Sequence, residues 1–165
     1  MMDKLTLVIP AKNESESLPK VLKELEPFKI KIIVVIPTDD HRTRQSIENF
    51  DCKIIEEKNG QGYGCALRNG IDQVETIFFC IFNADGSFNP IYLNNMYEKL
   101  SKTNIDFIFC SRYESDGGSD DDTFLTYVGN KIFTFLCNFL FSLGITDVLF
   151  TYLMGRTQKY KALDL

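Results

Sequence analysis

The sequence is poor in the residues that hold a structural metal or a secreted disulfide framework. It has one histidine, His41, and five cysteines, an odd number spread widely along the chain. No pair of them has the spacing of zinc ligands. Cys80 and Cys110 lie inside apolar runs, where a free cysteine behaves as a small buried hydrophobe. We therefore expect a reduced, cytoplasmic protein whose cysteines fill its core.

An excess of positive charge is also missing. The formal net charge is -5 and the pI is near 4.9. A nucleic-acid partner would need a basic face, so no nucleic acid is expected. Residues 1–4 lead directly into an apolar strand, which predicts no signal peptide. The most apolar stretch, residues 132–143, is shorter than the about 20 residues that span a bilayer.

What the sequence does have is the composition of an ordinary globular protein. It is 44% hydrophobic and 25% charged, and its 165 residues suit a single domain covering residues 1–165. Continuous apolar runs bounded by turn-forming residues predict buried strands. These strands are expected at residues 5–10, 30–36, 52–56, 76–82 and 107–110.

Helical patterns separate these strands. Apolar residues at i, i+3, i+4 and i+7 predict an amphipathic helix over residues 18–25, with Ser17 as its cap and Pro19 in its first turn. Further helices are expected at residues 41–50, 62–74 and 90–100. The last of them is predicted to have Asn89 as its cap and Pro90 at its first position. This alternation predicts an α/β fold with a mostly parallel, doubly wound sheet.

Polar clusters follow the predicted strands, at residues 11–14, 38–40, 83–87 and 111–112. Ligands bind beyond the carboxyl ends of the strands in such sheets, so these clusters predict a ligand crevice. In Asn83-Ala84-Asp85-Gly86-Ser87, a carboxylate can face a divalent metal and a diphosphate, because hard cations take oxygen ligands. The same residues also favour an Asx turn. Taken alone, the two interpretations stay open. The Asp39-Asp40 pair is likewise open between a ribose-binding pair and a solvated turn.

The motifs, taken in order, resemble those of the family 2 glycosyltransferases. Residues 7–18 resemble the opening "VIPxYNE…L", and residues 62–70 belong to a stretch similar to the "GxGxAxxxG" helix start, which begins at Gly60. Residues 83–90 stand where the family carries "DADGSxxP". Residues 110–113 match "GSRY", most familiar from dolichyl-phosphate mannose synthase and the polyprenyl-phosphate glycosyltransferases. Gly129-Asn130 and Asp147 fit the "GN…D" that follows.

This resemblance implies a GT-A fold that binds a nucleotide-diphospho-sugar and inverts the anomeric carbon. It assigns the donor site to Pro10, Ala11, Asn13, Glu14, Asp39, Asp40, Gly62, Asn83, Ala84 and Asp85. It assigns a weakly held Mg²⁺ or Mn²⁺ to Asp85, Asn83 and Ser87. Asp85 and Arg112 would carry the catalysis. Arg112, Asn130 and Asp147 would lie on the acceptor side, where a polyprenyl phosphate is the expected acceptor.

Several positions depart from the family pattern. Asn83 replaces the first metal-site aspartate, and residues 36–40 read Ile-Pro-Thr-Asp-Asp where the family has "DDGS". Tyr127 stands where the lipid-phosphate branches often carry a second arginine. Residues 150–153 keep little of "SGFR", and the chain stops at Leu165, where family members usually continue. We therefore expect a truncated or minimal member. The alternative is a degenerate, non-catalytic paralogue that acts as a binding or assembly partner.

Two further stretches bear on the acceptor. The Gly/Asp/Ser tract at residues 114–122 is typical of a mobile solvated loop more than of a metal site. Residues 132–143 predict an apolar helix. It is either a core or homodimer helix, or a membrane-surface helix that receives a polyprenyl phosphate and makes the protein peripheral to a membrane. We find no clear general base, which a phosphate acceptor would explain, because a phosphate monoester is largely ionised near neutral pH.

Overall fold

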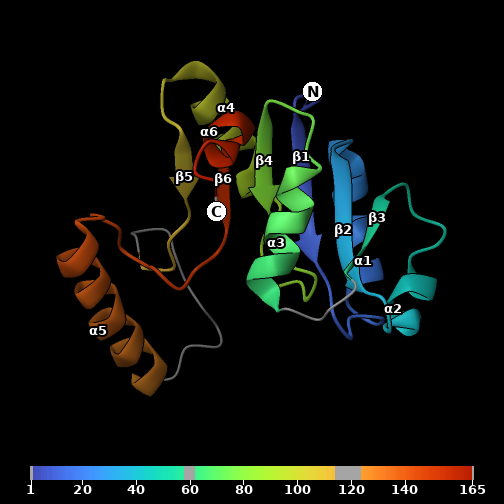
Figure 1. Ribbon diagram of the computed structural model, residues 1–165, viewed down its shortest axis with the longest axis horizontal. Helices are drawn as coiled ribbons and strands as arrows, with labels where there is room; N and C mark the ends of the chain where they lie inside the picture. The colour runs from blue at the N-terminus through green and yellow to red at the C-terminus, as the bar shows by residue number, and fades with distance from the viewer. Residues whose placement is uncertain (1, 58–61, 114–123, 165) are drawn as a thin grey trace. The chain divides into compact units, whose positions relative to one another are not determined.

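The computed structural model describes residues 2–57, 62–113 and 124–164 (Figure 1). Its centre is a six-stranded sheet in the order β3-β2-β1-β4-β6-β5. β1, β2, β3 and β4 are parallel neighbours, whereas β6 runs antiparallel to β4. The strands are β1 Leu5–Pro10, β2 Lys31–Pro37, β3 Lys53–Glu57, β4 Phe78–Ile81, β5 Phe107–Phe109 and β6 Leu153–Arg156. The predicted α/β fold with a mostly parallel sheet is confirmed.

The helices alternate with the strands as predicted. They are α1 Leu18–Leu25, the short 3-10 helix η1 Glu26–Phe28, α2 His41–Ser46, α3 Tyr63–Asp72, α4 Tyr92–Lys102, α5 Phe124–Phe141 and α6 Thr157–Lys161. The described chain forms two compact units. The first comprises Met1–Ile108 and Leu153–Leu165, and the second is Phe109–Tyr152. The antiparallel strand β6 and the helix α6 of the first unit are missing from the sequence-based prediction.

The core of the first unit lies on both faces of the sheet. On one face, buried Val8, Val35 and Phe79 pack with α3, which crosses the face turned to the viewer in Figure 1. Gly70 allows α3 to lie close, since a Cβ there would overlap Val8 and come 2.9 Å from Cγ2 of Val35. Phe78, the neighbour of Phe79 in β4, points to the opposite face of the sheet. Its ring meets that of Tyr97 of α4 edge-on. The sheet is therefore covered by helices on both faces.

Of the two predicted helix caps, Ser17 is confirmed in position but not in hydrogen bonding, and Asn89 is wrong. Ser17 lies at the N-cap of α1 but makes no capping hydrogen bond, because its hydroxyl donates to the Glu14 carboxylate instead. α4 begins at Tyr92, and the Asn89 side chain accepts a hydrogen bond from the Ile91 N–H at 3.0 Å, ahead of the helix. The proline predicted in the first turn of α1 is confirmed.

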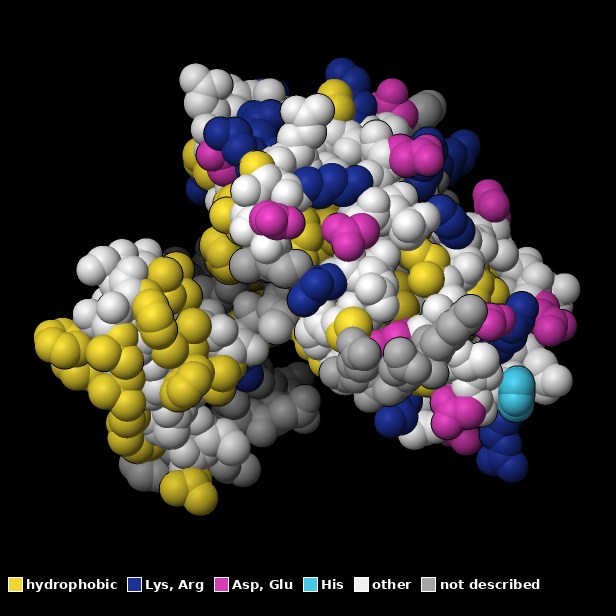
Figure 2. Space-filling view, in the orientation of Figure 1, with side chains coloured by type: hydrophobic (Ala, Val, Ile, Leu, Met, Phe, Trp, Pro, Cys, Tyr) yellow, Lys and Arg dark blue, Asp and Glu magenta, His cyan; other side chains and the backbone are white. Residues whose placement is uncertain are grey.

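The second unit is built on the 18-residue helix α5. It begins well before the predicted residue 132, and its apolar side chains are largely exposed. Leu125 is 80% exposed, Phe135 68% and Phe139 76%, so the interpretation of this stretch as a core helix is wrong. Figure 2 shows hydrophobic side chains gathered over α5. Within the described residues, no helix has the length and apolar content needed to cross a membrane.

The cysteines differ from the expectation in part. All five are free thiols. Cys80 is buried as predicted, whereas Cys52, Cys65, Cys110 and Cys137 are only partly buried. Burial raises the pKa of Cys110 to about 11. The prediction that every cysteine is core filler is therefore wrong for four of the five.

Candidate functional site

A cavity of about 320 Å³ lies in the first unit, at the carboxyl ends of β1, β2 and β4. Seven of the residues predicted for the donor site line it: Pro10, Ala11, Glu14, Gly62, Asn83, Ala84 and Asp85. A larger hollow of about 700 Å³ lies at the opposite ends of the strands, between residues such as Thr6, Lys31 and Lys53. No predicted site residue lines that second hollow. The smaller cavity is therefore the candidate site.

The loop after β1 is held against the start of α2. Asn13 has a left-handed backbone with φ of 61°, and its N–H donates to Oδ2 of Asp40 at 2.6 Å. The next N–H, of Glu14, donates to Oγ1 of Thr43 at 2.9 Å. Asparagine is among the few residues that adopt this backbone conformation readily. These bonds fix the loop that carries Glu14 to the wall of the cavity.

The aspartate pair after β2 does not line this cavity. The Asp40 N–H donates to the Pro37 carbonyl at 3.0 Å, and the Asp40 side chain accepts the Thr43 N–H at 3.2 Å, capping α2. Partial burial acts to raise the pKa of Asp40, but hydrogen bonds from Asn13 and Thr43 outweigh it and hold the pKa below its ordinary value. Asp39 is exposed. Of the two interpretations of Asp39-Asp40, a ribose-binding pair and a turn, the structure agrees with the turn.

The central motif forms a turn and also lines the cavity. The Ser87 N–H donates to Oδ1 of Asp85 at 2.9 Å, an Asx hydrogen bond, and Gly86 adopts a positive φ of 84°. Nδ2 of Asn83 donates to Oγ of Ser87 at 3.0 Å. Oδ1 of Asn83 accepts from the hydroxyl of Tyr63 at 3.3 Å. The turn interpretation is therefore confirmed, and Asn83 and Asp85 also line the cavity. The metal interpretation stays a prediction.

The oxygen atoms of this turn are an incomplete set of metal ligands. Asp85 supplies a carboxylate, Asn83 an amide oxygen and Ser87 a hydroxyl, which suit a hard divalent cation in type but bring a single negative charge. Across the described residues, no group of three or more His, Cys, Asp or Glu side chains could hold a metal. The turn fits a cation only if other ligands, such as diphosphate oxygens or water, complete its shell.

The N-terminus of α3 forms another part of the cavity wall. Gly62 is its N-cap, with φ of 93°, and Gly62 and Tyr63 both line the cavity. Backbone N–H groups at the start of a helix, together with its dipole, favour a bound anion such as a phosphate. Gly60, the first glycine of the motif that leads into this helix, lies outside the described residues.

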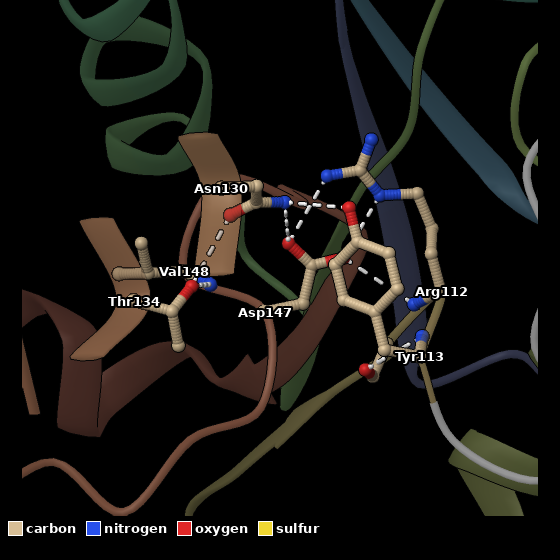
Figure 3. Close-up of polar contacts among 7 residues, drawn as sticks. Arg112, Tyr113, Asn130, Thr134, Asp147 and Val148 are labelled. Atoms are coloured by element: carbon tan, nitrogen blue, oxygen red, sulfur yellow. Dashed lines mark hydrogen bonds and ion pairs between the residues drawn. The ribbon is translucent and has the colours of Figure 1, made fainter. Parts of the chain in front are cut away.

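The second unit contains a hydrogen-bond network centred on Asp147 (Figure 3). Nε and Nη2 of Arg112 donate to the two Asp147 carboxylate oxygens at 2.8 and 3.1 Å. Nδ2 of Asn130 donates to the same carboxylate at 2.9 Å and to the Tyr113 hydroxyl at 3.0 Å. The Thr134 hydroxyl donates to Oδ1 of Asn130 at 3.1 Å. The three residues predicted for the acceptor side are thus joined to one another.

The Asp147 side chain is fully buried, while that of Arg112 is 21% exposed. Burial acts to raise the pKa of Asp147, but hydrogen bonds from Arg112 and Asn130, together with the positive charge of Arg112, outweigh it and lower the pKa. The Arg112 guanidinium also lies 5.4 Å from the ring centre of Tyr113 and 5.2 Å from that of Phe150. Arg112 and Asp147 therefore form an ionised pair that is joined by two side-chain hydrogen bonds.

Sequence reasoning missed several residues of both regions. Glu57 and Tyr63 line the cavity of the first unit, and Glu57 is buried there. Lys12, which belongs to the predicted polar cluster 11–14 but was not assigned to the donor site, lines it as well. Their signal was available, because each stands beside a residue of a recognised motif or at the end of a predicted strand. In the second unit, Tyr113 and Thr134 join the network. Tyr113 meets Asn130 across 17 residues, a contact that only the fold could show. Thr134 lies one helical turn from Asn130 in α5, a spacing that the sequence could have shown.

Comparison with known proteins gives the family. The model of glycosyl transferase family 2 matches residues 6–164. An uncharacterized glycosyltransferase of Mycobacterium tuberculosis is 30% identical over 100 residues, which cover 61% of this chain and 45% of the relative. An uncharacterized protein of Methanocaldococcus jannaschii is 26% identical over 112 residues, covering 62% of this chain and 49% of the relative. The matched part spans about half the length of these relatives. The chain belongs to glycosyl transferase family 2.

Solved structures show the same fold. The mannosyl-3-phosphoglycerate synthase of Rubrobacter xylanophilus superposes with a TM-score of 0.75 at 16% identity, covering 94% of this chain and 54% of that protein. A mannosyltransferase of Pyrobaculum calidifontis, solved with GDP-Man and Mn²⁺, gives a TM-score of 0.58 at 18% identity, covering 66% of this chain and 35% of that protein. TarS of S. aureus gives 0.66 at 15% identity, covering 97% and 49%. The predicted GT-A fold is confirmed.

Proposed function

We propose that this chain transfers a sugar from a nucleotide-diphospho-sugar bound in the cavity at the carboxyl ends of β1, β2 and β4. The observation that carries the proposal is that Glu14, Gly62 and Asp85, predicted from three separate motifs, line one cavity. Its volume of about 320 Å³ lies within the range of small-molecule sites. Membership of family 2 supports the same class of reaction. We propose further that residues 1–165 act together as one glycosyltransferase domain.

The side chains around the cavity suit the parts of such a donor. The N-terminus of α3, at Gly62 and Tyr63, offers N–H groups to the diphosphate. Lys12, on the loop after β1, adds a positive charge to the lining of the cavity. The carboxylates of Glu14 and buried Glu57 are acceptors for the hydroxyl or N–H groups of a nucleoside. A departing nucleoside diphosphate gains negative charge, which such donors stabilise.

A divalent cation, Mg²⁺ or Mn²⁺, would be held by Asp85 with Asn83 and Ser87, and weakly in the absence of donor. When bound, it would supply a Lewis acid for the leaving diphosphate. The mannosyltransferase of Pyrobaculum calidifontis, which shares the fold, was solved with GDP-Man and Mn²⁺. That pairing supports a sugar nucleotide and a metal as the ligands to test first.

The acceptor we propose is a lipid phosphate of the polyprenyl type, as in the dolichyl-phosphate mannose synthase branch that the "GSRY" motif resembles. A phosphate acceptor arrives already ionised near neutral pH, with a second pKa of about 6, so it does not need a general base. Attack by its oxygen on the anomeric carbon would break the bond to the diphosphate and invert that carbon. The exposed apolar side chains of α5 support peripheral association with a membrane.

The test is donor hydrolysis with sugar nucleotides in the presence of Mn²⁺. We expect slow release of nucleoside diphosphate that needs the metal and is lost in Asp85→Ala. The control is Asp3→Ala, which removes the same charge from an exposed position outside the cavity. If neither hydrolysis nor donor binding is found in the wild-type chain, the degenerate-paralogue alternative, based on Asn83 and Pro37, replaces this proposal.

A further inference from the structure

Tyr63 joins two parts of the cavity wall that are distant in sequence. It is the first residue of the ten-residue helix α3 and directly follows the N-cap Gly62. Its hydroxyl donates to Oδ1 of Asn83 at 3.3 Å, across a separation of 20 residues. Tyr63 and Asn83 both line the cavity. The bond therefore connects the N-terminus of α3 to the turn that follows β4.

The amide group of Asn83 lies between two hydroxyl groups in different surroundings. Its oxygen accepts from Tyr63, which lines the cavity. Its nitrogen donates to Oγ of Ser87 at 3.0 Å, and Ser87 does not line the cavity. An amide has its acceptor oxygen at one end only, so a rotation by half a turn would exchange an acceptor for a donor. The bond from Tyr63 thus favours the orientation with the Asn83 oxygen on the cavity side.

This orientation matters because the residue is an asparagine. In the family pattern that residues 83–87 resemble, an aspartate stands at this position. The two oxygens of a carboxylate are equivalent, so either orientation presents an acceptor to the cavity. Asn83 presents an oxygen in one orientation and N–H groups in the other, and a hard cation binds only the oxygen. An asparagine here therefore needs a neighbour that selects its orientation.

We propose that Tyr63 is a positioning residue, which keeps the Asn83 amide oxygen turned toward the cavity so that this neutral side chain can bind a divalent cation beside Asp85. A carbonyl-type oxygen has two lone pairs, so the Tyr63 hydroxyl occupies one and leaves the other for the cation. The bond from the Ser87 N–H to Oδ1 of Asp85, at 2.9 Å, holds the carboxylate in the same turn. The inference rests on the proposed function and names the group on which the use of an asparagine depends.

The test is a double-mutant cycle of the full chain: wild type, Tyr63→Phe, Asn83→Asp and the double variant. Mn²⁺ is titrated calorimetrically in the presence of GDP or UDP, whichever binds the wild type more tightly. Tyr63→Phe should weaken Mn²⁺ binding roughly two- to ten-fold when residue 83 is asparagine, the effect of losing one neutral hydrogen bond. In the Asn83→Asp background the same change should alter binding by less than about twofold, because either carboxylate oxygen can bind the cation.

A second measurement uses neither metal nor nucleotide. The side-chain NH₂ group of Asn83 gives NMR signals that are identified by their loss in Asn83→Asp. Their order parameter should fall in Tyr63→Phe, because the amide loses one of its two partners. The matched control is Tyr92→Phe. Tyr92 is the first residue of α4, is 44% exposed against 45% for Tyr63, and does not line the cavity. Its variant should change neither the NMR signals nor Mn²⁺ binding.

Nucleotide affinity in EDTA should be the same in Tyr63→Phe and the wild type, because the aromatic ring remains. The inference is overturned if Tyr63→Phe weakens Mn²⁺ binding equally in both backgrounds or in neither. It is also overturned if the Asn83 amide stays as rigid in Tyr63→Phe as in the wild type, or if the wild type binds no Mn²⁺ with nucleotide present. In these cases metal-free nucleotide binding and donor hydrolysis still decide the sugar-transfer proposal separately. Absence of nucleotide binding under every condition would instead contradict that proposal, and this inference with it.

Discussion

The guanidinium of Arg112 donates two hydrogen bonds, at 2.8 and 3.1 Å, to the buried carboxylate of Asp147, which lies 35 residues further along the chain. The backbone N–H of Arg112 donates to the same carboxylate at 3.3 Å. Arg112 belongs to the stretch that matches "GSRY", and Asp147 belongs to "GN…D". The resemblance therefore implies that this pair lies on the acceptor side. The pair thus stabilises the unit that would also bind the acceptor.

Asp147→Ala is expected to lower the free energy of unfolding by about 3–5 kcal/mol, because it leaves a largely buried guanidinium without its carboxylate partner. The double variant Arg112→Met with Asp147→Leu should lose less than the single variant, since it removes both charges. Urea denaturation gives both values, with Asp3→Ala as the control for an exposed aspartate. Equal losses in the single and double variants would contradict the prediction.

The same carboxylate makes stability depend on acid. The pKa of Asp147 in the folded protein is below its ordinary value, so folding favours the ionised form. Its contribution is fully present above the ordinary aspartate pKa of about 4 and is lost as the pH falls through the lowered pKa. Asp40, whose pKa is also lowered, acts in the same direction. Unfolding free energies measured from neutral pH downward should fall in this window.

Asp147→Asn should flatten this acid dependence, because the amide does not titrate, while Asp3→Ala should leave it unchanged. The wild-type unfolding free energy could instead stay constant below the ordinary aspartate pKa. In that case neither Asp147 nor Asp40 would be stabilised in its ionised form, and the hydrogen bonds to their carboxylates would not persist in solution.

The close contact of α3 with the sheet gives a third prediction. Gly70→Ala should lower the free energy of unfolding by about 1–3 kcal/mol, because its methyl group would overlap Val8 and crowd Val35. Gly64, in the same helix, has nothing within 4 Å of the position of a Cβ. Gly64→Ala should therefore stabilise the protein, by about 0.5–1 kcal/mol. Thermal denaturation of the two variants measures the difference, and a similar change in both would show that α3 packs otherwise.

The strands that the sequence predicted well are those with continuous apolar runs. β1 was predicted with its observed bounds, Leu5–Pro10, because a buried parallel strand leaves an unbroken hydrophobic signature. β6 was missed because Gly155 and Arg156 interrupt its short pattern, and its antiparallel pairing with β4 depends on contacts distant in sequence. Asp40 was predicted to bind donor, whereas its carboxylate caps α2, since one residue type suits both tasks.

The residues of the site could be predicted where a polar motif directly follows a predicted strand. They could not be predicted where the contact joins residues far apart in the sequence. Glu14 and Asp85 each follow a strand, so their place at the cavity could be inferred from the strand order. The hydrogen bond between Tyr63 and Asn83 gave no such signal, because it joins residues 20 positions apart in the chain. Tyr127, which stands where a second arginine often occurs in the lipid branches, instead supplies a ring 5.7 Å from the Lys131 ammonium.

The last prediction concerns Asn83 and the metal. Two unit charges about 4 Å apart interact by roughly 4 kcal/mol at an effective dielectric near 20, so a site with one carboxylate fewer holds a divalent ion less tightly. We expect the wild type to bind Mn²⁺ appreciably only together with a sugar nucleotide, whose diphosphate supplies further ligands.

Asn83→Asp should tighten that binding without disturbing the fold. An aspartate there can still accept from the Tyr63 hydroxyl, and the Ser87 hydroxyl can donate to it in place of accepting. Asp85→Ala should abolish binding and release the Ser87 N–H. Calorimetric titration of Mn²⁺ into the three proteins, with and without nucleotide, is the measurement, and Asp3→Ala is the control. Tight binding by the wild type without nucleotide, or binding that survives Asp85→Ala, would place the metal elsewhere.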